Sequence, residues 1–195
     1  AAAPAVPGRL GDRRGARGNL RDRLCCSPDL HLHRNECRGQ RLRHLDSGEH
    51  MIIFSSTVNT NSLRLYYTLT SDFVNFTAPA ELYHDVAEAS VIDGFLAKVA
   101  EGHYIMATAQ QGTIWLVDSP SPFGPWTERA AAAMPTPREG PALIRINGTW
   151  HLYADYYTGV SDNVFRMATA TDTTNWTDRS ALTLLPRNSD VPDFV

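Results

Sequence analysis

The feature that most constrains the fold is a pattern that recurs about every fifty residues. Three segments, "YYTLTSDFVNFTAPAEL", "WLVDSPSPFGPWTERAA" and "RMATATDTTNWTDRSAL", each run from a short β-rich strand through a turn to an aromatic residue followed by Thr. The aromatics are Phe76, Trp126 and Trp176, spaced by 50 and 50 residues. Such a period, with about four short strands per unit, is typical of β-propeller blades. The pattern predicts an all-β fold with about three blades between residues 46 and 187, and packing between blades for the three aromatics.

Each unit also contains a second kind of strand. The segments "EHMIIFSS", "GHYIMATA" and "GTWHLYAD" begin at Glu49, Gly102 and Gly148, and "ASVIDGFLAKV" and "REGPALIRI" precede the last two of them. Asn147-Gly148 lies between two apolar runs, which is the strongest short-range signal of a β-hairpin. The units lack the Trp-Asp of WD40 blades, the Gly-Gly of kelch blades and the Thr-before-Trp order of the sialidase Asp-box. These three propeller classes are therefore disfavoured.

The first 45 residues differ in composition from the rest. They hold ten arginines and four acidic residues in a chain whose formal net charge is -3, and they show no strand or helix periodicity. The sequence therefore predicts a segment 1–45 that is disordered or foreign to the domain, followed by a partial propeller over 46–195. A nucleic-acid-binding tail is disfavoured because no aromatic residue is interleaved with the arginines to stack on bases.

Several other classes of site find no support in the sequence. Cys25, Cys26 and Cys37 match no zinc spacing, and His103 and His151 have no second ligand at a useful spacing, so no metal site is expected. No apolar run approaches the roughly 18 residues that a membrane helix needs. The start "AAAPAVPGRL" lacks the basic and continuous apolar regions of a signal peptide.

Two acidic residues stand at the head of the presumed innermost strands. Asp93 of "VIDG" and Glu139 of "REGP" are 46 residues apart, as are Gly102 and Gly148. The equal spacing predicts equivalent positions in neighbouring blades, facing a shared channel. A like charge nearby raises the pKa of one carboxyl, and a protonated carboxyl beside an ionised one suits glycoside hydrolysis. The alternative is structural: Glu139 pairs with Arg138, and Asp93 caps its strand turn.

Over about residues 46–187 the chain resembles glycoside hydrolase family 43, five-bladed propellers that act as α-L-arabinofuranosidases, β-xylosidases and endo-arabinanases. The resemblance is carried by "LYYTLTSDFVNFT" (65–77), "SVIDG" (90–94), "SPFGPW" (121–126) and "REGPALIRINGTWHLYADYY" (138–157). It implies that Glu139 is the general acid and that Asp93 tunes the pKa of that acid and orients it. The complete family fold can hold a structural calcium ion, and no other cofactor is implied.

The third carboxylate of this inverting family, an aspartate in the first blade that activates water, has no clear counterpart. Asp29, after Pro28, is the only formal candidate, and its surroundings do not resemble that blade. The general base is therefore unknown. The resemblance covers about three blades of five, so we expect a fragment with weak activity or none.

The resemblance also suggests how sugar would be bound and where the protein would work. Asp155, Tyr156 and Tyr157 end the strand that follows Glu139 and are candidates for contacts with a sugar, although aromatic strand ends also serve in packing. The leading function is an inverting glycosidase acting on arabinose- or xylose-containing polysaccharides and oligosaccharides. A catalytically silent carbohydrate-binding propeller and a plain interaction propeller are the alternatives. We expect a monomer, secreted by family resemblance, that binds carbohydrate and neither nucleic acid nor membrane.

Overall fold

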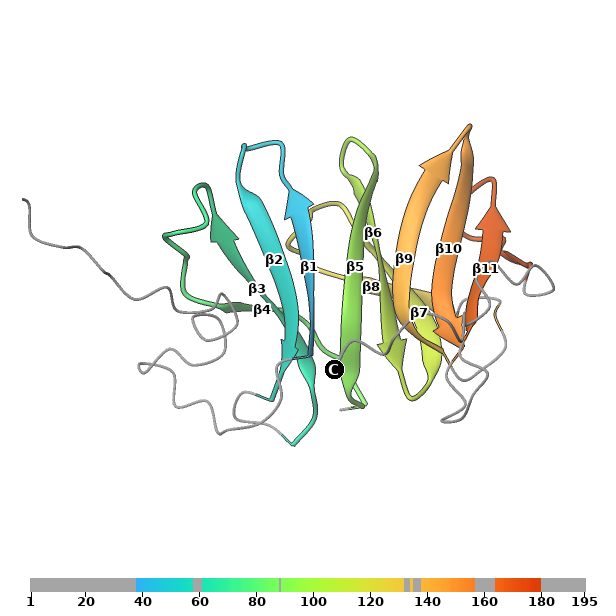
Figure 1. The fold of residues 1–195 in the computed structure, drawn as a ribbon, viewed down its shortest axis with the longest axis horizontal. Coiled ribbons are helices and arrows are strands. Elements are labelled where there is room, and N and C mark those ends of the chain that lie inside the picture. Colours follow the sequence, from blue (N-terminus) through green and yellow to red (C-terminus); the bar gives the residue numbers. More distant parts are fainter. Residues whose placement is uncertain are drawn as a thin grey trace, which may run out of the picture. The chain divides into compact units, whose positions relative to one another are not determined.

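The computed structural model describes residues 38–57, 61–87, 89–131, 134, 138–156 and 164–179. In these ranges it contains β-strands and no helix (Figure 1). The strands form three four-stranded antiparallel sheets, each ordered as in the sequence. The first sheet holds β1 (Arg38–His44), β2 (His50–Ser56), β3 (Arg64–Thr70) and β4 (Ala80–Tyr83). The second holds β5 (Val91–Ala100), β6 (His103–Gln110), β7 (Thr113–Ser119) and β8 (Thr127–Ala131). The third holds β9 (Arg138–Ile146), β10 (Thr149–Tyr156), β11 (Val164–Ala170) and β12 (Thr177–Asp178). The all-β prediction with three blades is confirmed.

The domain begins earlier than the sequence pattern indicated. We expected ordered structure from residue 46, but β1 lies at residues 38–44 and pairs along its length with β2. Its sequence, RGQRLRH, has one aliphatic residue and no alternation, so periodicity gave no signal. Backbone pairing with the buried strand β2 overrides the weak local propensity of this segment. Residues 1–37 lie outside the described part of the chain.

Two hydrophobic cores join the three sheets. One core contains residues of the first and second sheets, among them Met51, Ile53 and Leu65 from the first and Val91, Tyr104 and Met106 from the second. The other lies between the second and third sheets and includes Ile105, Ala107, Leu152 and Trp150. Strand β5, the first of its sheet, contacts β1 on one side and β9 on the other, and the three run side by side in Figure 1. The sheets therefore pack in sequence order with their first strands adjacent.

The three repeated aromatics occupy equivalent positions. The Thr that follows each one lies opposite the penultimate residue of the third strand of its sheet: Thr77 opposite Leu69, Thr127 opposite Asp118, and Thr177 opposite Thr169. Trp126 packs against the core between the first two sheets, and Trp176 against the core between the last two. The fifty-residue spacing thus reports the repeat of the fold, and packing between blades is confirmed for both tryptophans.

Candidate active site

Each first strand is interrupted at the same register. The interruption follows the residue that faces the penultimate position of the second strand: Arg38 opposite Ser55, Ile92 opposite Ala109, and Glu139 opposite Asp155. One extra residue then enters the first strand as a β-bulge, at Gly39, at Asp93-Gly94 and at Gly140-Pro141. Bulges break the regular ladder and redirect the chain, and they are frequent next to active sites.

The bulges correct the equivalence that we inferred from spacing. Asp93 has φ 55° and Gly140 has φ 58°, so Asp93 is equivalent to Gly140 and not to Glu139. The reason is a second bulge in β5, between Lys98 and Ala100, which adds Val99 to this hairpin and to no matching place in β9. Equivalent positions in the two bulges are therefore 47 residues apart, and the spacing of 46 residues matched Asp93 to the residue before its true counterpart.

The Asp93 carboxylate nevertheless reaches the backbone of the residue that follows Glu139. Oδ2 of Asp93, on β5, accepts the backbone N–H of Gly140 at 3.0 Å. Oδ1 of Asp155, on β10, accepts the backbone N–H of Glu139 at 3.0 Å. Two carboxylates from two different sheets therefore hold the consecutive amides of Glu139 and Gly140.

The bulge explains why this arrangement forms. Where the ladder is interrupted, amides lose their regular cross-strand acceptors, and a partly buried N–H without a partner is costly. Asp93 and Asp155 supply charged acceptors, which form stronger hydrogen bonds than neutral ones. Gly140 takes the left-handed conformation at little cost, and Asp93 is one of the few other residue types that enter it with some frequency.

The predicted site residues differ in how far the structure describes them. Glu139, Asp93 and Asp155 are all half-buried. Tyr156 pairs through its backbone with Val164 on one side and Arg138 on the other. Tyr157 and Asp29 lie outside the described residues, so their proposed roles stay predictions. Sequence reasoning proposed Asp155 as a sugar contact, which stays a prediction, and missed its bond to the amide of Glu139, because only the bulge makes that donor available.

The first strand of the first sheet contributes no carboxylate at the equivalent place. The residues there are Arg38 and Gly39, and the whole of β1 reads RGQRLRH without Asp or Glu. The aspartate that the resemblance implies in the first blade is thus absent from β1. The identity of a base stays open.

The histidines considered above take part in local polar contacts. His103 lies 4.0 Å from Asp118 and 3.4 Å from Arg129, whose guanidinium also binds Asp118. Nδ1 of His151 lies 3.2 Å from the carbonyl of Thr149. In the described ranges no group of three or more His, Cys, Asp or Glu side chains could hold a metal ion. The described residues thus contain no cluster of this kind for the calcium ion that the resemblance allows.

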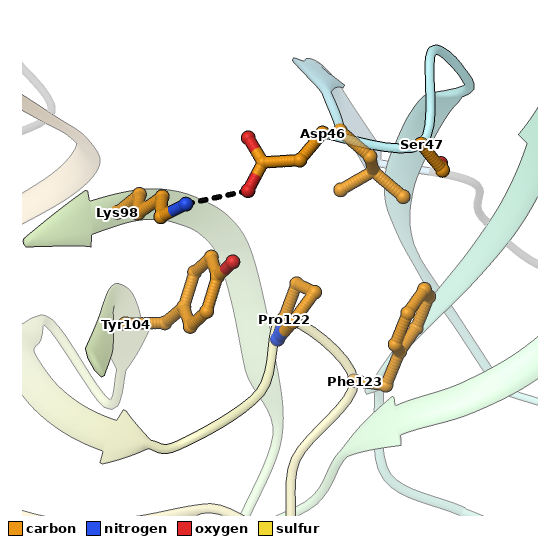
Figure 2. Close-up of a pocket in the computed structure, with 7 residues that line it drawn as sticks. Asp46, Ser47, Lys98, Tyr104, Pro122 and Phe123 are labelled. Atoms are coloured by element: carbon orange, nitrogen blue, oxygen red, sulfur yellow. Dashed lines mark hydrogen bonds and ion pairs between the residues drawn. The ribbon is translucent and has the colours of Figure 1, made fainter. Parts of the chain in front are cut away.

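A small cavity of about 140 Å³ lies at the other end of β5. It is lined by Leu45, Asp46, Ser47, Lys98, Tyr104, Pro122 and Phe123. Figure 2 shows the ammonium of Lys98 directed at the carboxylate of Asp46 above the ring of Tyr104. The hydrogen bond to Asp46, with a second to Glu101, raises the pKa of Lys98. The charge of the Lys98 ammonium is thus balanced by the carboxylates of Asp46 and Glu101. The cavity lies apart from the bulge at Asp93, which is near the start of the same strand.

The part of the chain that the structure describes holds no helix long and apolar enough to cross a bilayer.

The fold is shared with solved glycosidases at low sequence identity. A thermostable family-43 glycoside hydrolase superposes with a TM-score of 0.63 at 12% identity, over 82% of this chain and 59% of that one. An endo-1,4-beta-xylanase from Bacteroides thetaiotaomicron gives 0.62 at 13% identity, over 82% and 58%. An alpha-L-arabinofuranosidase from Podospora anserina gives 0.59 at 12% identity, over 74% and 50%. The chain thus spans between half and three fifths of the length of these proteins, and no curated protein matches it significantly.

The sequence comparison agrees with the fold. Residues 44–189 match the family described as "Probable glycosyl hydrolase domain", which is related to glycoside hydrolase family 43. The match includes the second and third sheets, with Asp93, Glu139 and Asp155. The chain therefore belongs to this family of glycosyl hydrolase domains related to family 43.

Proposed function

We propose that this chain is a glycosidase domain acting on arabinose- or xylose-containing polysaccharides or oligosaccharides with inversion of configuration. The observation that supports the proposal is the bond from the Gly140 amide to Asp93, in which the carboxylate of one residue that matches a family motif holds the backbone next to the other, Glu139. The family match supports the reaction class, and solved relatives named as an arabinofuranosidase and a xylanase favour pentose-containing substrates.

In the proposed mechanism Glu139 is the general acid. Its carboxyl gives a proton to the glycosidic oxygen as the bond from that oxygen to the anomeric carbon breaks. Water attacks the anomeric carbon from the opposite face and loses a proton to a base. Asp93 orients the segment that bears Glu139, since its carboxylate holds the next amide. An inverting pair needs carboxyls about 6.5–9.5 Å apart to admit the water. We assign the base to a group other than Asp93, because the Asp93 carboxylate is engaged with the backbone next to Glu139.

A second function, carbohydrate binding without turnover, is favoured by one observation. The register position that carries Asp93 in the second sheet carries Gly39 in the first, and Arg38 precedes it. General base catalysis typically contributes about 10²–10⁴-fold, so a domain that lacks the base binds sugar but turns it over slowly. In both functions the domain is a carbohydrate-binding monomer exported from the cell, as the resemblance implies.

Two measurements test the proposal and separate the alternatives. The first is release of nitrophenol from arabinofuranosides and xylosides by the unsubstituted chain, by Glu139→Gln, and by Glu128→Gln as a matched control at an exposed position of strand β8. We expect Glu139→Gln to lose most turnover, by about 10²–10⁴-fold, and Glu128→Gln to lose none. The second is calorimetric binding of arabinan and xylan fragments. Binding without turnover supports the silent propeller. A chain that shows no binding and no turnover contradicts both functions.

A further inference from the structure

We infer that Asp155 is a positioning residue, which fixes the backbone of Glu139 from the neighbouring strand and acts on the reaction only through it. The inference rests on the proposed function, in which Glu139 is the acid. It assigns Asp155 a role different from the direct sugar contact that the sequence suggested. The role follows from where its two carboxylate oxygens lie.

The carboxylate of Asp155 faces the bulge from directly across the sheet. Asp155 and Glu139 are opposite partners in the β9–β10 pair, and the Asp155 Oδ1 atom accepts the Glu139 N–H at 3.0 Å. A Cβ added to Gly140 would lie 3.6 Å from Oδ1, 3.7 Å from Cγ and 3.8 Å from Oδ2 of Asp155. The Asp155 carboxylate thus lies against the backbone of both Glu139 and Gly140. A Cβ at residue 140 would be at ordinary van der Waals distance from it.

Asp93 and Asp155 restrain the bulge from two sides. Asp155 holds the amide of Glu139 from within the third sheet, and Asp93 holds the amide of Gly140 from the second sheet. With both amides held, the peptide between the two residues cannot rotate without breaking a charge-assisted hydrogen bond. The Cα of Glu139, from which its side chain extends, is therefore fixed in the frame of two sheets.

This restraint matters for an acid that must meet a glycosidic oxygen. A misplacement of about 1 Å in a catalytic group can cost roughly 10²-fold in rate. A residue that binds sugar directly would raise KM when removed, whereas a residue that only places the acid would lower kcat and leave KM nearly unchanged. The two roles of Asp155 therefore give different kinetic signatures.

Three variants of the full 195-residue chain separate these roles. Asp155→Ala removes the acceptor of the Glu139 amide, and Asp155→Asn keeps a side-chain oxygen that can accept it. Asp72→Ala is the matched control, because Asp72 also accepts backbone N–H groups, from Val74 and Asn75, but in an exposed turn of the first sheet. The measurements are amide hydrogen exchange at Glu139 and Gly140 and, on a nitrophenyl pentoside, kcat and KM.

We expect amide exchange at Glu139 to quicken about 10-fold or more in Asp155→Ala and to recover in Asp155→Asn, and kcat to fall about 10–100-fold in Asp155→Ala at unchanged KM. Asp72→Ala should alter none of these values. Unchanged exchange at Glu139 in Asp155→Ala, or a rise in KM alone, would overturn the inference. Absence of turnover and of sugar binding in the unsubstituted chain contradicts the proposed function instead, and amide exchange then decides by itself whether Asp155 holds Glu139.

Discussion

At the scale of single residues, the bulge of β9 depends on a backbone conformation as much as on side chains. Gly140 has φ 58°. A Cβ added there would meet no atom closer than the Asp155 Oδ1 atom at 3.6 Å, so there is room for it. Gly140→Ala should therefore destabilise the protein through conformation, by about 1–2 kcal/mol, and Gly140→Asn by less because Asn tolerates this region.

Gly94, in the bulge of β5, gives the contrasting case. A Cβ there would lie 2.7 Å from the Cδ1 atom of the buried Leu65, so packing and not φ opposes a side chain at this position. Urea denaturation of Ala and Asn variants at both positions tests the distinction. Rescue by Asn is expected at 140 and not at 94, and equal losses for Ala and Asn at 140 would contradict the conformational account.

A second prediction at this scale concerns acid stability. Hydrogen bonds from the backbone N–H of Asn75 and then of Val74 lower the pKa of Asp72 to about 2. In the unfolded chain the pKa is about 3.9, so ionised Asp72 stabilises the folded state above about pH 4. That contribution is lost as the pH falls from about 4 to about 2.

The variant Asp72→Asn measures this contribution. The free energy of unfolding of the wild type should exceed that of the variant near neutral pH, and the difference should shrink as the pH falls through this window. Urea denaturation at several pH values gives both quantities. A difference that is constant with pH would show that Asp72 acts through hydrogen bonds and not through its charge.

At the scale of strands and sheets, the third sheet has two unlike faces. Leu152 and Ala154 on β10 are fully buried against the second sheet. On the other face Ile144 is 49% exposed, Ile146 44% and Phe165 47%. Substitution on the two faces should therefore have very different costs.

Leu152→Ala should cost about 2–5 kcal/mol because it leaves a cavity in a packed core. Ile144→Thr keeps the β-branched shape on an exposed position and should change stability by about 0.5 kcal/mol or less. Thermal unfolding of the two variants checks this. A large loss for Ile144→Thr would mean that the exposed face is covered in solution.

The elements that the sequence predicted well were those with a strong local pattern. The apolar runs of β2, β6 and β10 and the Asn147-Gly148 turn, where both residues have positive φ, appeared where expected. Strand β1 and the register of the bulges could not be predicted, because pairing with β2 and the insertion of Val99 depend on the neighbouring strand and leave no periodic signal. The equivalence inferred between Asp93 and Glu139 was therefore one residue out of register, and the roles of both residues stay predictions.

At the scale of the whole domain, Arg129 on β8 links the second sheet to the third. Its guanidinium binds both carboxylate oxygens of Asp118 in its own sheet, and donates to the carbonyl and the hydroxyl oxygen of Thr173 in the β11–β12 turn. Arg129 is about three quarters buried on its side chain, so these charge-assisted bonds are only partly screened.

Arg129→Met should keep the aliphatic packing and release the turn. We expect faster amide exchange at residues 172–176, with residues 103–110 unaffected, and a smaller effect in Thr173→Ala, which retains the bond to the carbonyl. Amide exchange followed by mass spectrometry measures both. An equal increase throughout the third sheet would indicate that Arg129 supports the sheet itself and not its junction with the second.

The left-handed backbone of Asp93 has a consequence for protein engineering. Asn enters this conformation more easily than Asp does and keeps a side-chain oxygen that can accept the Gly140 amide, so it would relieve strain at this position. A library of variants selected only for heat resistance should therefore accumulate Asn at residue 93 and discard the carboxylate proposed to serve the acid. Selection for stability is therefore expected to favour Asn at residue 93, and selection for catalytic activity to favour Asp.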